Sequence, residues 1–169
     1  MDFKIYEHAF EMFRQCNCIG QYNCIFTAMK NTNDEGIQAG LSVGKFRAAG
    51  SAIGDALTAN NALNNMVYDG MLINQTENGF GFIPLRNKSV SLTANANKME
   101  AFPNEFFFVG NNFITQIEVK NWAIFNKKVK KVNFNLSNGT KIKLMIRLEE
   151  KDVPYQFQNF SAFVSRFQK

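Results

Sequence analysis

The chain has 169 residues, of which 46% are hydrophobic and 20% charged, and its formal net charge is +5. This length suffices for one domain with a real core, and the composition excludes an intrinsically disordered chain. The mildly basic balance favours anionic partners only weakly, because many proteins of similar charge bind none. Phenylalanine stands out with 18 residues against one tryptophan, and buried rings can stabilise a small fold without cross-links.

The N-terminus and the cysteines predict a compartment. The first ten residues contain Asp2 and Glu7 and lack the apolar stretch of a signal peptide. No window approaches the roughly 18 apolar residues that a transmembrane helix needs. Cys16, Cys18 and Cys24 are odd in number and crowded, whereas a secreted disulfide framework uses an even, dispersed set. We therefore expect reduced thiols in a soluble, cytoplasmic protein.

The first 65 residues differ in character from the remainder, so we divide the chain into an N-terminal segment, 1–65, and a domain, 66–169. Apolar residues three or four apart predict an amphipathic helix over 3–15, and 22–29 predict a strand or a short buried segment. Residues 36–57 carry glycines four apart, at Gly36, Gly40, Gly44, Gly50 and Gly54. This spacing favours a tightly packed helical or irregular segment, with an oligomerisation helix or a membrane-surface contact as alternatives.

Two hairpins are predicted in the second part. Met71–Thr76 and Phe80–Leu85 flank a turn that contains Asn-Gly, a strong hairpin signal. A three-residue loop there would pair Ile73 with Ile83 and Met71 with Leu85.

The second hairpin has a clearer pattern, because apolar and polar residues alternate on both sides of Ser137-Asn138-Gly139. A three-residue loop with Gly139 in the left-handed region pairs Phe134 with Ile142 and Val132 with Leu144. It also places Asn135 and Asn133 beside Lys141 and Lys143. A slip of one residue would turn every apolar side chain to solvent, so this register is well specified.

Weaker strands are predicted over 89–94, 105–109 and 113–123, and the chain is expected to end in a helix. Pro154 fits the start of that helix, where its missing N–H does no harm. Phe160, Phe163, Val164 and Phe167 then form one apolar stripe.

About seven short strands followed by one amphipathic helix resemble the pleckstrin-homology-like (PH-like) domains, including their bacterial and GRAM-type members, over about residues 66–169. The resemblance implies an α+β fold. It would be a bent antiparallel β-barrel or sandwich plugged by the C-terminal helix, with a helical or irregular N-terminal segment outside it. Phosphoinositide-binding members share a basic cluster at the first hairpin. Here Thr76–Gly79 contains no Lys or Arg, so that activity is not implied, and the resemblance indicates an interaction scaffold.

A basic run is the main candidate for a binding site. Eight basic residues and no acidic residue lie between residues 120 and 147. The predicted register places Lys131, Lys141, Lys143 and Arg147 on the outward face of one hairpin, where they could receive an anionic partner. The alternative is a solvated face that protects an edge strand from pairing with other chains. Trp122 adjoins this face, either as an aromatic platform for a nucleic-acid base or as a structural residue.

Catalytic and metal chemistry have little support. The sequence has one histidine, so a Ser-His-Asp triad would have to use His8. No phosphate-binding or dinucleotide-binding motif is present. His8 and the three cysteines number four potential zinc ligands, but Cys-x-Cys-x5-Cys is not a common zinc spacing, and inert thiols are favoured. Glu149, Glu150 and Asp152 fit a solvated turn before the last helix. We expect no enzyme, no metal and no cofactor.

The sequence therefore indicates a non-enzymatic binding or scaffolding module for a protein or peptide, which could be a second copy of the chain. An exposed strand edge and the glycine-spaced segment are its candidate surfaces. The alternative is an anion-binding module that contacts nucleic acid or an anionic membrane surface through the lysine-rich hairpin face. Salt dependence separates the two, because phosphate-driven binding weakens steeply as salt rises.

Overall fold

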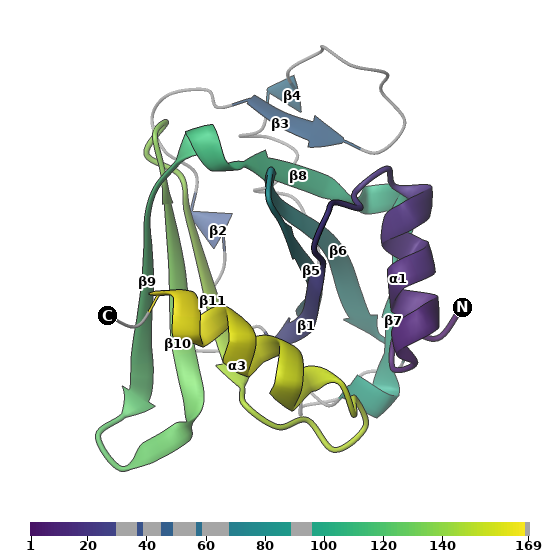
Figure 1. The fold of residues 1–169 in the computed structure, drawn as a ribbon, viewed down its shortest axis with the longest axis vertical. Coiled ribbons are helices and arrows are strands. Elements are labelled where there is room, and N and C mark those ends of the chain that lie inside the picture. Colours follow the sequence, from purple (N-terminus) through teal and green to yellow (C-terminus); the bar gives the residue numbers. More distant parts are fainter. Residues whose placement is uncertain (30–36, 39–44, 49–56, 59–67, 89–95, 168–169) are drawn as a thin grey trace.

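The computed structural model describes residues 1–29, 37–38, 45–48, 57–58, 68–88 and 96–167 (Figure 1). The helices in these residues are α1 (Tyr6–Gln15) and α3 (Gln156–Phe167). The strands are β1 (Cys24–Met29), β2 (Ile37–Gln38), β3 (Lys45–Ala48), β4 (Leu57–Thr58), β5 (Gly70–Thr76), β6 (Gly79–Asn87), β7 (Met99–Ala101), β8 (Phe107–Gly110), β9 (Ile114–Ala123), β10 (Asn126–Leu136) and β11 (Lys141–Arg147). Three short 3-10 helices, Ala96–Lys98, Pro103–Glu105 and Asn111–Phe113, connect some of them.

The strands form one antiparallel sheet in the order β4-β3-β8-β6-β5-β1-β11-β10-β9, with β2 beside β11 and β7 beside β6. Among the described residues, seven strands, β5 to β11, follow residue 66. Six of them correspond to predicted strands, whereas β7 was not predicted and the predicted strand over 89–94 lies outside the described residues. The α+β class and the C-terminal helix are therefore confirmed. The sheet is bent, but its end strands β4 and β9 do not pair in the described part of the chain, so it does not close into a barrel (Figure 1).

Helix α1 forms where the spacing of apolar residues predicts one. Ala9, Met12 and Phe13 share one face and are buried. The helix ends where Asn17 takes a left-handed conformation with φ 53°, which asparagine tolerates better than most residues. The N–H of Cys18 then donates to the carbonyl of Phe13 at 2.9 Å.

Helix α3 carries the predicted phenylalanine stripe. Phe160 and Phe163 are 0% exposed and Val164 is buried. The ring centroid of Phe163 lies 5.1 Å from that of Phe26 on β1 and 6.1 Å from that of Phe80 on β6. The stripe therefore lies against the inside of the bent sheet.

The described residues form two apolar clusters, one on each face of the central strands. The cluster beneath α3 takes Phe26 and Ala28 from β1, together with apolar residues of β5, β6, β10 and β11. The cluster beneath α1 takes Ile25 and Met29, the intervening side of β1. Because β1 contributes to both clusters, every one of its residues is buried.

The two predicted hairpins have different outcomes. Between β10 and β11, Phe134 pairs with Ile142 and Val132 with Leu144, and Gly139 has φ 81°, so the predicted register is confirmed. Between β5 and β6 the predicted register is wrong. Ile73 pairs with Phe82 rather than Ile83, and the turn has two residues instead of three.

Some predicted segments lie partly outside the described residues. The predicted strand over 89–94 is outside them entirely. Of the glycine-spaced segment, 36–57, the described parts are extended in β2, β3 and the first residue of β4. The division after residue 65 stays a prediction, although β1 lies between β5 and β11, which both follow it.

Candidate binding surface on strands β9 to β11

Strands β9, β10 and β11 form one end of the sheet, which we call the wing (Figure 1). Its inner face packs against the cluster beneath α3, and its outer face is the opposite side. Alternation sets the two faces, because successive side chains of a strand point to opposite sides. On β10 the buried residues are Lys130, Val132, Phe134 and Leu136. Their neighbours in sequence therefore lie on the outer face.

The structure brings the four predicted basic residues to this outer face. Lys131 on β10 lies opposite Met145 on β11. Lys141, Lys143 and Arg147 therefore share the side of Lys131, since they stand two or four residues from Met145. Lys141 is exposed, and the other three are partly buried.

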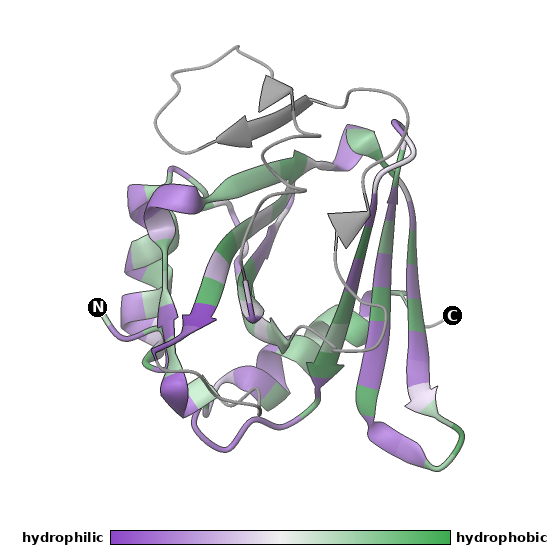
Figure 2. Cartoon of the chain, turned by 180° about the vertical axis from the view of Figure 1, so that it is seen from behind, coloured by the Kyte–Doolittle hydropathy of each residue, from purple (hydrophilic) through white to green (hydrophobic). Residues whose placement is uncertain are grey.

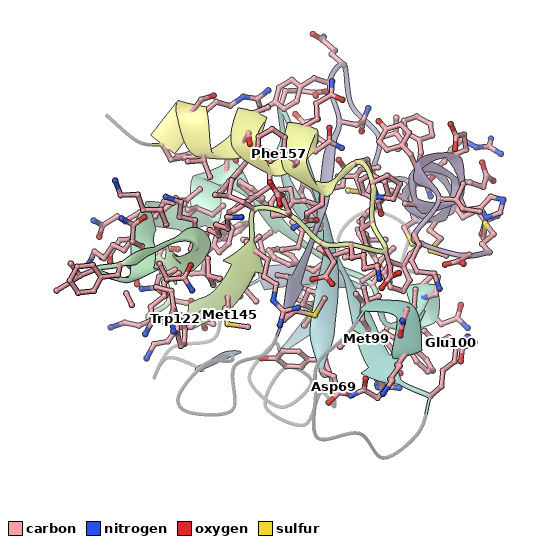
Figure 3. The ribbon with its side chains drawn as sticks, turned by 90° about the horizontal axis from the view of Figure 1, so that it is seen from below. Asp69, Met99, Glu100, Trp122, Met145 and Phe157 are labelled. Carbon is pink, nitrogen blue, oxygen red and sulfur yellow. The ribbon has the colours of Figure 1, made fainter. Side chains whose placement is uncertain are left out.

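Trp122, the predicted aromatic residue, contacts one of these lysines. The Lys131 ammonium lies 4.4 Å from the centroid of the Trp122 ring, a cation–π geometry. Figure 3 shows Trp122 and Met145 near each other on the side of the sheet away from α3. Trp122 is partly buried, so it supports Lys131 and keeps some of its surface exposed.

Lys131 also lies opposite Lys120 on β9, and two like charges across a strand pair repel each other. The arrangement offsets this repulsion by giving each lysine another partner. Lys120 Nζ lies 2.7 Å from Glu118 Oε2, and this hydrogen bond lowers the pKa of Glu118. The Trp122 ring faces the Lys131 charge.

Arg147 already has an acidic partner. Its Nη1 donates to Glu150 Oε2 at 3.2 Å. Burial raises the pKa of Glu150, and the Arg147 charge lowers it in part. Because this arginine is paired, the outer face presents mainly lysine charges.

The charge of the chain is segregated into this region. Residues 119–148 contain eight of the 19 basic residues and none of the 14 acidic ones. The remainder of the chain holds 11 basic and 14 acidic residues, a net charge of −3. The wing and its connections therefore supply the whole positive balance of the protein.

The tip of the β9–β10 hairpin was not predicted from the sequence. Ile124 and Phe125 form its two-residue turn, between the paired residues Ala123 and Asn126, and are 85% and 98% exposed. Figure 2 shows a hydrophobic turn joining more hydrophilic strands. Turns normally use Gly, Asn, Asp or Pro. An Ile-Phe pair between two predicted strands was the signal that could have identified this tip.

Lysines surround the tip. Lys127 and Lys128 follow it and are exposed. Lys130 Nζ donates to Asn121 Oδ1 at 2.6 Å, just below the tip. The pairing shifts register between Asn126 and Lys130, and such irregularities at the end of a hairpin redirect side chains.

The candidate zinc ligands do not come together. His8 Nδ1 accepts a hydrogen bond from the Asp2 N–H at 3.2 Å, while Cys24 Sγ donates to the Asn159 carbonyl at 2.9 Å. All three cysteines are free, and burial raises the pKa of Cys18 to about 12. Among the described residues, no group of three or more His, Cys, Asp or Glu side chains is placed to hold a metal ion.

Strand β9 offers a second kind of surface. Within the described part of the chain it pairs only with β10, so its other edge has no strand neighbour. It has ten residues, and all are exposed or half-buried. Such an edge can accept an additional strand.

Comparisons with family models, with curated proteins and with solved structures gave no match. In the described residues, neither helix is long and apolar enough to cross a membrane.

Proposed function

We propose that the chain is a non-enzymatic binding module whose wing docks on a polyanionic, phosphate-bearing surface. The observation that carries this proposal is the charge segregation: residues 119–148 hold eight basic and no acidic residues, against a net charge of −3 elsewhere. A cytoplasmic location belongs to the same proposal, as does a PH-like arrangement. The order of seven strands and a terminal helix supports the latter.

The type of cation indicates how the partner is recognised. Lys141 and Lys143 are flexible point charges, while the arginine of the outer face, Arg147, is paired with Glu150. Arginine is the residue that grips one phosphate in a bidentate manner, and lysine suits a diffuse field of anions. We therefore propose attraction to a surface with many phosphates rather than a pocket for one phosphate.

Heparin chromatography and anisotropy of a labelled single-stranded oligonucleotide test this proposal. The variant K141E/K143E reverses two charges of the outer face. The matched control, K98E/K151E, changes the net charge equally at exposed positions outside the wing. We expect the wing variant to elute at lower salt than the control, and its oligonucleotide salt slope to fall by about two. Equal behaviour of the two variants would contradict the proposal.

The second candidate is the protein or peptide partner that the sequence first indicated. The edge of β9 that has no strand neighbour among the described residues favours it, because main-chain groups along this edge could pair with an added strand. Its exposed lysine, Lys120, opposes such pairing, as charged residues on edge strands generally do.

Light scattering at several protein concentrations separates this candidate from the first. Association of the chain with itself through β9 would persist at high salt, because strand pairing depends little on screening. If the protein is a monomer under all salt conditions, self-association through this edge is ruled out.

A further inference from the structure

Within the described part of the chain, the apolar tip of the β9–β10 hairpin does not pack into the core. Ile124 and Phe125 are 85% and 98% exposed. They belong to neither of the two apolar clusters. Exposed apolar pairs at a two-residue turn are costly in water and are not required by the turn itself, since polar residues form turns better.

We infer that this tip inserts into the interface of an anionic lipid bilayer, with the surrounding lysines on the headgroups. This inference rests on the proposed function and identifies the phosphate-bearing surface as lipid headgroups. Lys120, Lys127 and Lys128 lie within four residues of the tip in sequence. Two apolar side chains at the end of a cationic hairpin match the layered chemistry of such a membrane, with acyl chains below charged headgroups.

The charge distribution also orients the molecule. The chain outside residues 119–148 has a net charge of −3, so an anionic bilayer repels it while attracting the wing. The hairpin extends away from the neighbouring elements at its turn (Figure 1). The tip is therefore the first part of the protein to reach the membrane.

Nucleic acid and protein fit the tip less well. A base stacks on an aromatic face, and Ile124 has none, although it occupies half of the turn. Protein interfaces are depleted of lysine at their centres, while lysines lie on both sides of this turn. The proposal therefore commits to a lipid surface.

The chain contains its own reporter for the test. Trp122 is its single tryptophan and lies two residues before Ile124. Vesicles containing about one third phosphatidylserine should shift its emission to shorter wavelengths. Brominated lipids should quench it, because quenching requires the indole to approach the acyl chains.

The variant I124S/F125S removes the apolar pair and leaves every charge. We expect vesicle affinity to fall roughly 100-fold, as two apolar side chains no longer leave water, with no change in heparin elution. The matched control is Phe157→Ser on α3, which removes a 55% exposed ring from the other side of the sheet (Figure 3). It should bind vesicles like the unmodified chain, and circular dichroism verifies that both variants are folded.

The outcomes separate this inference from the proposed function. Unchanged vesicle binding by I124S/F125S, or binding without quenching of Trp122, would overturn tip insertion while the basic wing stands. Binding of the oligonucleotide but not of vesicles would overturn the proposal of a lipid partner and indicate that the wing binds nucleic acid. Binding of neither probe, with heparin elution insensitive to K141E/K143E, would overturn both.

Discussion

The centre of the sheet and the wing differ in how many of their faces are buried. In the centre, β1 and β5 are buried at every position, because α1 covers one face and α3 the other. In the wing, burial alternates along β10 and β11, because only the inner face packs. This difference in burial determines where charged binding residues can lie. Among the described residues, no helix covers the outer face of the wing, and this face carries the lysines, whereas both faces of the centre are covered.

The largest effect should come from the inner face. Phe163 is 0% exposed, and its ring meets Phe26, Phe80 and Phe160. We expect Phe163→Ala to lower the free energy of unfolding by about 3–5 kcal/mol. Trp122→Ala on the outer face should cost only about 1 kcal/mol, mainly its contact with Lys131. Urea unfolding measures both. Equal losses would show that the outer face is as tightly packed as the inner one.

Gln156 connects the two parts of the sheet. This buried side chain accepts from the Thr27 N–H at 2.7 Å on β1, and it donates to the Arg147 carbonyl at 2.8 Å on β11. Gln156→Leu would keep the volume but leave those groups buried without a partner. We expect a loss of about 2–4 kcal/mol in urea unfolding.

Hydrogen exchange gives the control for this variant. The Thr27 amide should lose protection more than amides deep in the β5–β6 hairpin, which Gln156 does not contact. A uniform loss of protection would mean that Gln156 acts on global stability rather than as a link between β1 and β11.

The same difference in burial explains which parts of the fold the sequence could predict. The register of β10 and β11 was correct because one-sided burial makes apolar and polar residues alternate, as at Phe134 and Asn135. The register of β5 and β6 was wrong because both faces are buried. Ile73 could then pair with Ile83 or with Phe82 and remain equally apolar.

The candidate surface was predictable to a similar extent. Alternation alone placed Lys131, Lys141 and Lys143 on one face. The contact between Lys131 and Trp122 and the pairing of Arg147 with Glu150 depend on rotamers and on the turn after β11, which no pattern specifies. The exposed tip was not predicted because isoleucine and phenylalanine, unlike glycine and asparagine, are not turn signals.

The two hairpin turns provide a smaller test of the comparison. Gly79 has φ 150°, and a Cβ there would lie 2.2 Å from the Val109 carbonyl oxygen of the neighbouring strand. Gly139 is exposed and has φ 81°. We expect Gly79→Ala to cost about 2–3 kcal/mol through strain and overlap, and Gly139→Ala about 1 kcal/mol through backbone strain. Thermal unfolding ranks them, and the reverse order would contradict the tighter packing of the centre.

The smallest effect concerns Glu150, just after β11. Burial raises its pKa above the ordinary 4.5, despite the nearby Arg147 charge. The folded state therefore favours the protonated carboxyl more than the unfolded state does, and this group's contribution to stability is lost as pH rises from about 4.5 through the folded pKa. Glu150→Gln removes the titration and keeps an acceptor for Arg147. Urea unfolding at pH 4 and pH 7 measures the free energy of unfolding of both proteins. We expect the stability of the variant relative to the unmodified chain to rise between pH 4 and pH 7, by less than about 1 kcal/mol. If the relative stability of the variant instead falls at pH 7, the ion pair with Arg147 outweighs the effect of burial. The turn after β11 would then resemble the solvated wing rather than the buried centre.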